Sequence, residues 1–212
     1  MKTAVIFDLD GTLLDTLQDL GNSVNATLGH FGYPQRTMEE IRTFVGNGAK
    51  WLIFRSVPEG ADAEEAFRYF RSYYQDHCRD ATKPYAGIDG ALAGIRENFP
   101  VAIVSNKPDA AVKELCAEWF PGIYALGERP DIPRKPAPDM VSQTMAYLGC
   151  ERCIYVGDSE VDIQTARNAG VPCLSVLWGF RNREELETVG GTHFCDEPSQ
   201  MEEIIKEIIY GK

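Results

Sequence analysis

Short apolar runs that alternate with helix-length amphipathic segments are the feature that most restricts the fold of this chain. Four runs are typical of buried strands, and they cover Thr3 to Phe7, Pro100 to Val104, Cys153 to Val156 and Pro172 to Leu177. Parallel strands need crossover connections and become buried on both faces, so this alternation predicts a parallel sheet with helices on each side. We therefore expect an α/β fold with a Rossmann-like, doubly wound parallel sheet as its core.

Residues 15–83 interrupt this alternation, because they show helical periodicity and no clear strand. One expected helix has its apolar residues on a single face, at Leu17, Leu20, Val24 and Leu28. The segment therefore predicts an all-helical insertion that covers the sheet as a lid. We expect two domains, an α/β core made of residues 1–14 and 84–212 and a helical cap made of residues 15–83.

The acidic balance of the chain limits its partners. The formal net charge is −11, from 32 acidic and 21 basic side chains, and no block of Lys or Arg stands out. Nucleic acid is not an expected partner, because binding to a phosphate backbone needs a concentrated basic face. A small phosphorylated substrate would also be repelled, so its site would need a bound metal and a few placed basic residues.

The N-terminus and the cysteines favour a cytoplasmic protein. The apolar run Ala4 to Phe7 is too short for a signal peptide, and we find no membrane span in the sequence. Six cysteines occur in a chain that is large enough to fold without disulfides, which indicates reduced thiols. Cys150 and Cys153 form a C-x-x-C, but no second ligand pair for a structural zinc site accompanies them. The oligomeric state stays open.

Carboxylates follow two of the expected strands. Ligands of an open parallel sheet bind beyond the carboxyl ends of its strands, and Asp8, Asp10 and Asp158 all fall there. Like charges this close are costly unless a cation or a proton compensates them. Side-chain oxygens of Asp8 and Asp158, with a backbone carbonyl at Asp10, are ligands that suit Mg²⁺. The alternative is that Asp8 and Asp10 only form a turn before Gly11.

Four short segments resemble, in order, the four motifs of haloacid dehalogenase superfamily hydrolases. They are FDLDGT at 7–12, VSN around Ser105, PRKPAPD around Lys135 and GDSEVD at 157–162. The resemblance covers nearly the whole chain. It implies the same α/β fold, and it identifies the helical insertion with the alpha-helical cap of that superfamily.

The resemblance also implies roles for the core residues. Asp8 would attack phosphorus to form an aspartyl-phosphate, and Asp10 would protonate the leaving oxygen and then activate water. Ser105 and Lys135 would hold the phosphoryl oxygens. From the residues alone, Ser105 could instead cap the next helix, and Lys135 could be a solvated loop lysine.

The remaining motif positions are expected around this centre. Asp158 resembles the metal-binding aspartate of the superfamily, and Asp162 would orient metal-bound water or Lys135 without binding the metal itself. The substrate site is expected to include Gly11, Thr12 and Asn106. Dehalogenases of the superfamily lack the second aspartate of the first motif, so the presence of Asp10 argues against dehalogenation.

The cap is expected to determine which substrate the protein selects. Gly46-Asn47-Gly48 resembles the substrate-specificity loop of the phosphoglycolate phosphatase group, and the segment ending at Arg181 is also similar to that group. Backbone N–H groups at this loop, Lys50 or Arg181 would suit a substrate carboxylate. The alternative is that Gly46 and Gly48 only permit a tight turn between helices and that Lys50 is solvated.

These observations predict a magnesium-dependent phosphatase that hydrolyses a small phosphomonoester, with phosphoglycolate as the leading substrate. The same core residues would also serve a pyrophosphatase, a nucleotidase, a sugar-phosphate phosphatase or a phosphomutase. A hypothesis from another class is a non-catalytic regulatory or binding protein that retains the fold. The complete set of core residues argues against this last hypothesis.

Overall fold

The computed structural model describes residues 2–211, and within this range six strands form one parallel sheet in the order β5-β4-β1-β6-β7-β8. The strands are β1 (Thr3–Phe7), β4 (Val101–Pro108), β5 (Tyr124–Glu128), β6 (Arg152–Gly157), β7 (Cys173–Val176) and β8 (His193–Cys195). The chain runs from β1 outward to β4 and β5 and then crosses to β6, β7 and β8 on the other side, so β1 lies where the strand order reverses. Its carboxyl end is therefore the place where a doubly wound sheet binds ligands.

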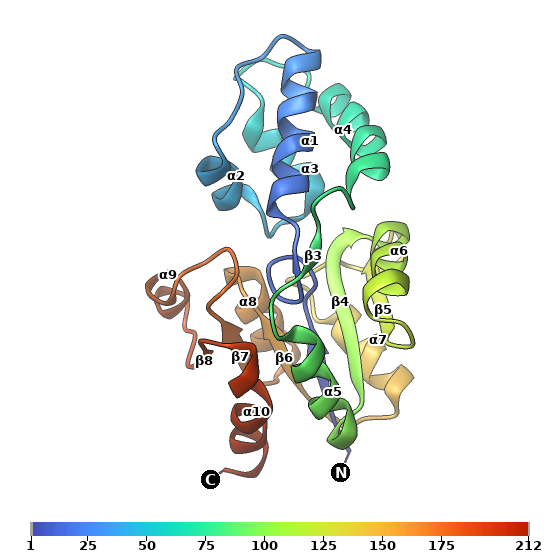
Figure 1. Ribbon diagram of the computed structural model, residues 1–212, viewed down its shortest axis with the longest axis vertical. Coiled ribbons are helices and arrows are strands. Elements are labelled where there is room, and N and C mark those ends of the chain that lie inside the picture. Colours follow the sequence, from blue (N-terminus) through green and yellow to red (C-terminus); the bar gives the residue numbers. More distant parts are fainter. Residues whose placement is uncertain (1, 212) are drawn as a thin grey trace.

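Helices cover both faces of the sheet, as expected for this fold class (Figure 1). They are α5 (Ile88–Asn98), α6 (Asp109–Trp119), α7 (Asp139–Leu148), α8 (Glu160–Ala169), α9 (Arg183–Thr188), the short 3-10 helix η1 (Pro198–Gln200) and α10 (Met201–Tyr210). Alternate residues of a strand point to opposite faces. Val5 and Phe7 of β1 accordingly pack in a cluster with α5, α6 and α10, whereas Ala4 and Ile6 pack in a cluster with α7 and α8.

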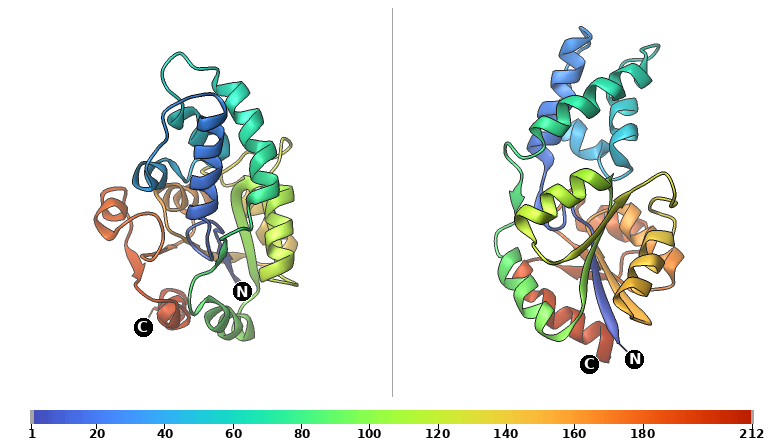
Figure 2. Two further views of the ribbon diagram at one scale, coloured as in Figure 1. Left: turned by 45° about the horizontal axis from the view of Figure 1, so that its top comes forward. Right: turned by 90° about the vertical axis from the view of Figure 1, so that its right-hand side faces the viewer.

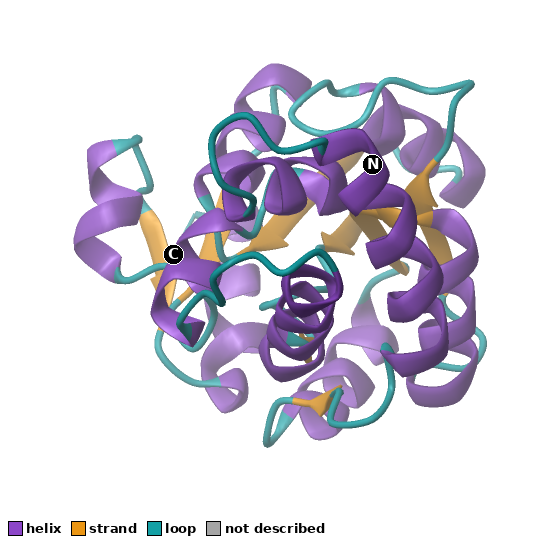
Figure 3. Cartoon of the chain, turned by 90° about the horizontal axis from the view of Figure 1, so that it is seen from above, coloured by secondary structure: helices purple, strands orange, loops and turns teal. Residues whose placement is uncertain are grey.

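Four helices form a separate bundle beyond the carboxyl end of the sheet (Figures 1 and 2). They are α1 (Leu17–His30), α2 (Met38–Phe44), α3 (Gly48–Ser56) and α4 (Ala63–His77), and they share their own apolar core. Seen from above, helices lie on both sides of the row of strands (Figure 3). Among residues 2–211, no helix is both long enough and apolar enough to cross a membrane.

A short antiparallel ribbon joins the bundle to the sheet. It pairs β2 (Leu14–Asp15) with β3 (Lys83–Pro84), the outgoing and returning strands of the chain. Buried Asp19 in the first turn of α1 accepts hydrogen bonds from the backbone N–H groups of Ala81 and Thr82 and from the Thr82 hydroxyl. The two ends of the helical segment are therefore fixed side by side directly above β1.

Candidate active site

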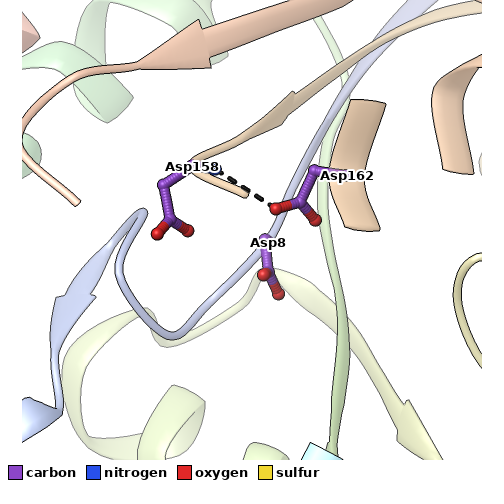
Figure 4. Close-up of side chains that lie close together, drawn as sticks. All are labelled: Asp8, Asp158 and Asp162. Atoms are coloured by element: carbon purple, nitrogen blue, oxygen red, sulfur yellow. Dashed lines mark hydrogen bonds between the residues drawn. The ribbon is translucent and has the colours of Figure 1, made fainter. Parts of the chain in front are cut away.

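Three aspartates meet at the carboxyl end of the sheet (Figure 4). Asp8 follows β1, Asp158 follows β6, and Asp162 lies in the first turn of α8. One carboxylate oxygen from each lies within 4.8 Å of the other two, and all three residues are buried. The parallel register of β1 and β6 causes this meeting, because their last residues lie at the same height in the sheet.

The carboxylate of Asp8 is held from two sides. Its Oδ1 accepts a hydrogen bond from the backbone N–H of Leu9 at 2.7 Å and lies 2.9 Å from Nζ of Lys135. Burial raises the pKa of Asp8 to about 7, and the charges of Asp162 and Asp10 act in the same direction while Lys135 opposes them. A single ammonium therefore does not compensate the ionised form of this carboxyl.

The ionised form of the Asp158 carboxyl is also not fully offset by positive charge. Its Oδ2 accepts a hydrogen bond from the backbone N–H of Phe180 at 2.8 Å, which fixes the direction of the side chain. Burial, followed by the charges of Asp162 and Asp8, raises the pKa of Asp158 well above its usual value. Both Asp8 and Asp158 therefore favour a proton or a cation beside them.

The turn after Asp10 brings the first motif close to Asp158. Gly11 has φ of 81°, a left-handed conformation that other residues rarely adopt, and a side chain there would collide with the Asp158 carboxylate. The hydroxyl of Thr12 then donates to Asp158 Oδ1 at 2.9 Å. Gly11 therefore allows the loop to approach Asp158, and Thr12 orients the Asp158 carboxylate.

Lys135 is the cation of this cluster. Its side chain is 2% exposed, and its Nζ lies 2.8 Å from Asp162 Oδ1, 2.9 Å from Asp8 Oδ1 and 2.9 Å from the Tyr155 hydroxyl. The Tyr155 hydroxyl in turn donates to the carbonyl oxygen of Val104 on β4. Burial alone would lower the pKa of Lys135, but Asp162 and Asp8 hold it well above its usual value. The residue is a fixed charge and not the solvated loop lysine that the sequence alone left possible.

Asp162 orients its neighbours. Its Oδ2 accepts hydrogen bonds from the backbone N–H groups of Asp158 and Ser159 and from the Ser159 hydroxyl, while its Oδ1 faces Lys135. Both oxygens are thus engaged with protein donors. This arrangement favours a supporting role over direct metal binding.

The donor set fits a hard divalent cation. Asp8, Asp158 and Asp162 bring three buried carboxylates against the one ammonium of Lys135, and the pKa values of Asp8 and Asp158 are raised as a result. Carboxylate oxygens are ligands for such cations, and a cation would offset the excess of negative charge. The cluster could therefore bind a metal ion.

The second motif supplies polar groups from β4. Ser105 is buried, and its Oγ accepts a hydrogen bond from the backbone N–H of Lys107. It does not cap α6, which begins four residues later at Asp109. Asn106 donates to the carbonyl oxygen of Lys135 at 2.9 Å, and within the described residues its buried Oδ1 has no hydrogen-bond partner. That oxygen is available to a ligand.

A cavity lies between the sheet edge and the helical bundle. Its core side is mainly polar and is lined by Asp8, Asp10, Ser105, Asn106, Lys107, Pro108, Asp158, Ser159 and Phe180. Its other side is mainly apolar and is lined by Leu20, Val45, Gly46, Gly48, Ala49, Leu52 and Tyr74. A ligand in this cavity would therefore meet the charged groups at one end and the bundle at the other.

The family model described as haloacid dehalogenase-like hydrolase matches residues 5–176. The chain belongs to this family. It is 31% identical to a phosphoglycolate phosphatase of Pseudomonas putida, over 86% of this chain and 72% of that protein. It is 35% identical to a phosphoglycolate phosphatase of Rhodobacter capsulatus, over 85% of this chain and 87% of that protein.

A solved structure agrees with the family assignment. The crystal structure of a candidate phosphoglycolate phosphatase from Lactobacillus delbrueckii subsp. bulgaricus has a TM-score of 0.90 and 37% sequence identity, and the match covers 97% of this chain and 99% of that one. The expected α/β fold of a haloacid dehalogenase-like hydrolase is confirmed.

In this hydrolase, the predicted specificity loop is only partly at the cavity. Gly46 and Gly48 line it, whereas Asn47 occupies the N-cap position of α3 without a side-chain capping bond. Lys50 faces away, because its place on α3 directs Nζ to Glu64 on α4 at 2.6 Å, with 47% of the side chain exposed. The structure therefore does not support direct contact between Lys50 and a substrate carboxylate.

Arg181 is also occupied elsewhere. Its guanidinium pairs with Glu160 at 2.9 Å and donates to the carbonyl oxygens of Arg42 and Val45, while Arg42 donates back to the carbonyl oxygen of Phe180. All these acceptors lie outside the acidic cluster. Arg181 thus links the loop after β7 to the helical bundle and is not among the residues that line the cavity, which differs from the expected contact with substrate.

Lys107 lines the cavity although no sequence motif indicated it. Its buried Nζ lies 2.7 Å from Asp10 Oδ1 and 2.6 Å from the hydroxyl of Tyr74. Its one sequence signal was its position directly after Asn106 at the end of an expected strand. No local pattern pointed to Tyr74, because α4 reaches Lys107 only through the tertiary fold.

Proposed function

We propose that this haloacid dehalogenase-like hydrolase is a magnesium-dependent phosphatase that hydrolyses a small phosphomonoester, with phosphoglycolate as the leading substrate. One observation carries the proposal: buried Lys135 faces Asp8 at 2.9 Å, beside Asp158, at the carboxyl end of β1. A carboxylate nucleophile, a fixed cation and a place for a metal are what phosphoryl transfer requires. The phosphoglycolate phosphatases among its relatives support the choice of substrate.

Each core residue has a defined task in this proposal. Asp8 attacks phosphorus and forms a new P–O bond as the bond to the leaving oxygen breaks, and Asp10 gives that oxygen a proton. Asp10 then takes a proton from water, which attacks phosphorus and releases Asp8 and inorganic phosphate. Lys135 and Ser105 hold the phosphoryl oxygens. Magnesium, held by Asp8, Asp158 and the backbone carbonyl of Asp10, would offset the negative charge of the site.

The helical bundle serves as the cap domain in this proposal. We assign residues 15–83 to the cap and residues 1–14 and 84–212 to the core, with β2 and β3 as the connection between them. The cavity between the two parts supports a small substrate, since its far wall is made of cap side chains. Closure of a cap excludes water and gives access to small molecules only.

Two finer points belong to the same proposal. A cytoplasmic location is supported by the six cysteines, all of which are free. A small phosphorylated metabolite, and not nucleic acid, is supported as the partner by the net charge of −11.

Phosphate release from a panel of phosphomonoesters, with magnesium and after metal stripping in excess EDTA, tests the proposal. We expect release from phosphoglycolate in magnesium and loss of release in EDTA. A phosphomutase would return the phosphoryl group to substrate and release little phosphate, and a regulatory protein would release none. Full activity after metal stripping would overturn the metal dependence.

Magnesium should stabilise the protein more at high pH than at low pH. Burial raises the pKa of Asp8 to about 7 from 3.8, and such a carboxyl contributes stability that is present below its unfolded pKa and lost as the pH rises through its folded pKa. The metal-free protein should therefore lose this contribution between about pH 4 and pH 7. Because magnesium binds the ionised form, the rise in Tm that it causes should be larger at about pH 8 than at about pH 5.5.

Differential scanning fluorimetry with and without magnesium at the two pH values measures this difference. Asp8→Asn is the control, because it removes the titrating carboxyl and should reduce the magnesium effect at the higher pH. An equal rise in Tm at both pH values would contradict metal binding at Asp8.

Lys50→Ala should leave catalysis nearly unchanged. The side chain is half exposed and pairs with Glu64 on the cap surface, so its loss should lower the free energy of unfolding by about 1 kcal/mol or less. Because Lys50 does not line the cavity, kcat/KM for phosphoglycolate should stay near the wild-type value. Steady-state kinetics on phosphoglycolate and on a simple aryl phosphate checks this, and a loss confined to phosphoglycolate would restore Lys50 as a substrate contact.

A further inference from the structure

Lys107 connects three parts of the molecule: strand β4, the loop after β1 and the cap helix α4. It lies at the end of β4, its Nζ contacts Asp10 in the loop after β1 at 2.7 Å, and it donates to the hydroxyl of Tyr74 on cap helix α4 at 2.6 Å. The same Nζ lies 4.8 Å from the centre of the Tyr74 ring. One ammonium is thus shared between the proposed proton donor and the cap.

Fold stability does not explain this arrangement. Removing two charges from water costs several kcal/mol per ion, and a buried ion pair can often be replaced by apolar side chains without loss of stability. The side chains of Lys107 and Asp10 are 4% and 15% exposed, so most of this cost applies. Moreover, Lys107, Asp10 and Tyr74 all line the cavity. The contact lies where a substrate would be.

The position of the Tyr74 hydroxyl depends on the cap. Its ring stacks on Phe70 with centroids 5.3 Å apart, and both residues belong to the apolar cluster of the helical bundle. Any displacement of α4 from the core would therefore carry the hydroxyl away from Lys107. The ammonium would keep Asp10 as its remaining partner, but it would no longer be anchored from the cap side.

We propose that Lys107 is a positioning residue that fixes the carboxylate of Asp10 at the wall of the cavity, and that Tyr74 makes this positioning depend on cap closure. The inference rests on the proposed phosphatase function and on Asp10 as its acid and base. Lys107 itself transfers no proton. With the cap closed, Asp10 is held where the leaving oxygen and later the attacking water must lie; with the cap open, it is not.

Leaving-group dependence separates positioning of Asp10 from general damage to the site. Phosphoglycolate needs its leaving oxygen protonated, whereas 2,4-dinitrophenolate leaves without a proton. Lys107→Met should lower kcat for phosphoglycolate by about a hundredfold or more, the usual range for an acid–base group. With 2,4-dinitrophenyl phosphate, formation of the aspartyl-phosphate should stay fast while its hydrolysis by water slows. Rapid mixing should then show a burst of dinitrophenolate followed by slow turnover.

Tyr74→Phe tests the link to the cap, because it removes one hydroxyl and keeps the ring that stacks on Phe70. It should lower kcat for phosphoglycolate by about tenfold or more, in line with the loss of one hydrogen bond to a charged group. Added to Lys107→Met, it should have no further effect, since both changes act through one contact. Lys113→Met makes the same chemical change at an exposed site on α6 and should match the wild type.

The outcomes are distinguishable. If Lys107→Met abolishes the burst as well as turnover, Lys107 does not act through Asp10 and the inference is wrong. Wild-type kcat for phosphoglycolate in Tyr74→Phe would overturn the dependence on the cap, even if Lys107→Met did not fold. If the wild-type enzyme shows no burst and no release of phosphate from either substrate, the proposed function itself fails.

Discussion

Asp8→Asn is expected to remove nearly all turnover on every phosphate ester. An amide is a poor nucleophile toward phosphorus, so no covalent intermediate can form, and the remaining rate should be below about a hundredth of the wild-type rate. Denaturing gels of enzyme quenched with ³²P-labelled substrate should show label on the wild type and none on the variant. A variant that still incorporates label would move the nucleophile to another residue.

Asp8→Asn should fold at least as well as the wild type. Its expected inactivity would then not result from unfolding. Burial raises the pKa of Asp8 to about 7, so ionised Asp8 costs the metal-free protein stability at higher pH. Asparagine carries no such charge. In EDTA, the Tm of Asp8→Asn should therefore exceed that of the wild type at about pH 8, and the gap should shrink as the pH falls.

The sheet was predictable because its central strands are apolar on both faces. The run Thr3 to Phe7 is β1 without change, and the expected helix with Leu17, Leu20, Val24 and Leu28 on one face is α1. β5 and β8 were not among the apolar runs, because β5 contains Gly127 and Glu128 and β8 has only three residues. Strands at the edges of a sheet are held by pairing with a neighbour, which a local pattern does not reveal.

The acidic cluster could be predicted because strand ends converge. Parallel register places the residues at the carboxyl ends of β1, β4 and β6 at one edge, so Asp8, Ser105 and Asp158 had to lie near one another. The cap contacts could not be predicted in this way. Lys50 is close in sequence to Gly48, but the turn of α3 points it to the cap surface.

Long polar side chains between the cap and the core were the least predictable part of the site. A lysine or arginine there can reach several carbonyl and carboxylate oxygens, and the choice depends on how cap and core pack. Arg181 contacts Glu160 and carbonyl oxygens of the bundle, while Lys107, for which no motif indicated a role, lines the cavity. The contacts of such side chains follow from this packing more than from any motif.

Lys135→Met is expected to damage both catalysis and stability. The Lys135 ammonium faces Asp8 and Asp162 at 2.9 and 2.8 Å, and methionine fills a similar volume without the charge. Loss of one group that stabilises developing charge should lower kcat/KM by about 10²- to 10³-fold. The two carboxylates would then be buried without their cation, which should lower the free energy of unfolding by about 3–5 kcal/mol.

The pH dependence of that damage identifies its origin. Without the ammonium, the charged form of Asp8 becomes still less favourable, so the stability deficit in EDTA should be largest near pH 8 and should shrink as acid protonates the carboxyl. Magnesium should recover part of the stability, because it supplies positive charge beside the same carboxylates. It should not recover the rate, because Lys135 is also proposed to hold a phosphoryl oxygen. Lys113→Met, with its 61% exposed side chain, is the matched control and should be close to wild type in both measurements. A deficit that is the same at low and high pH would mean that Lys135 acts through packing and not through its charge.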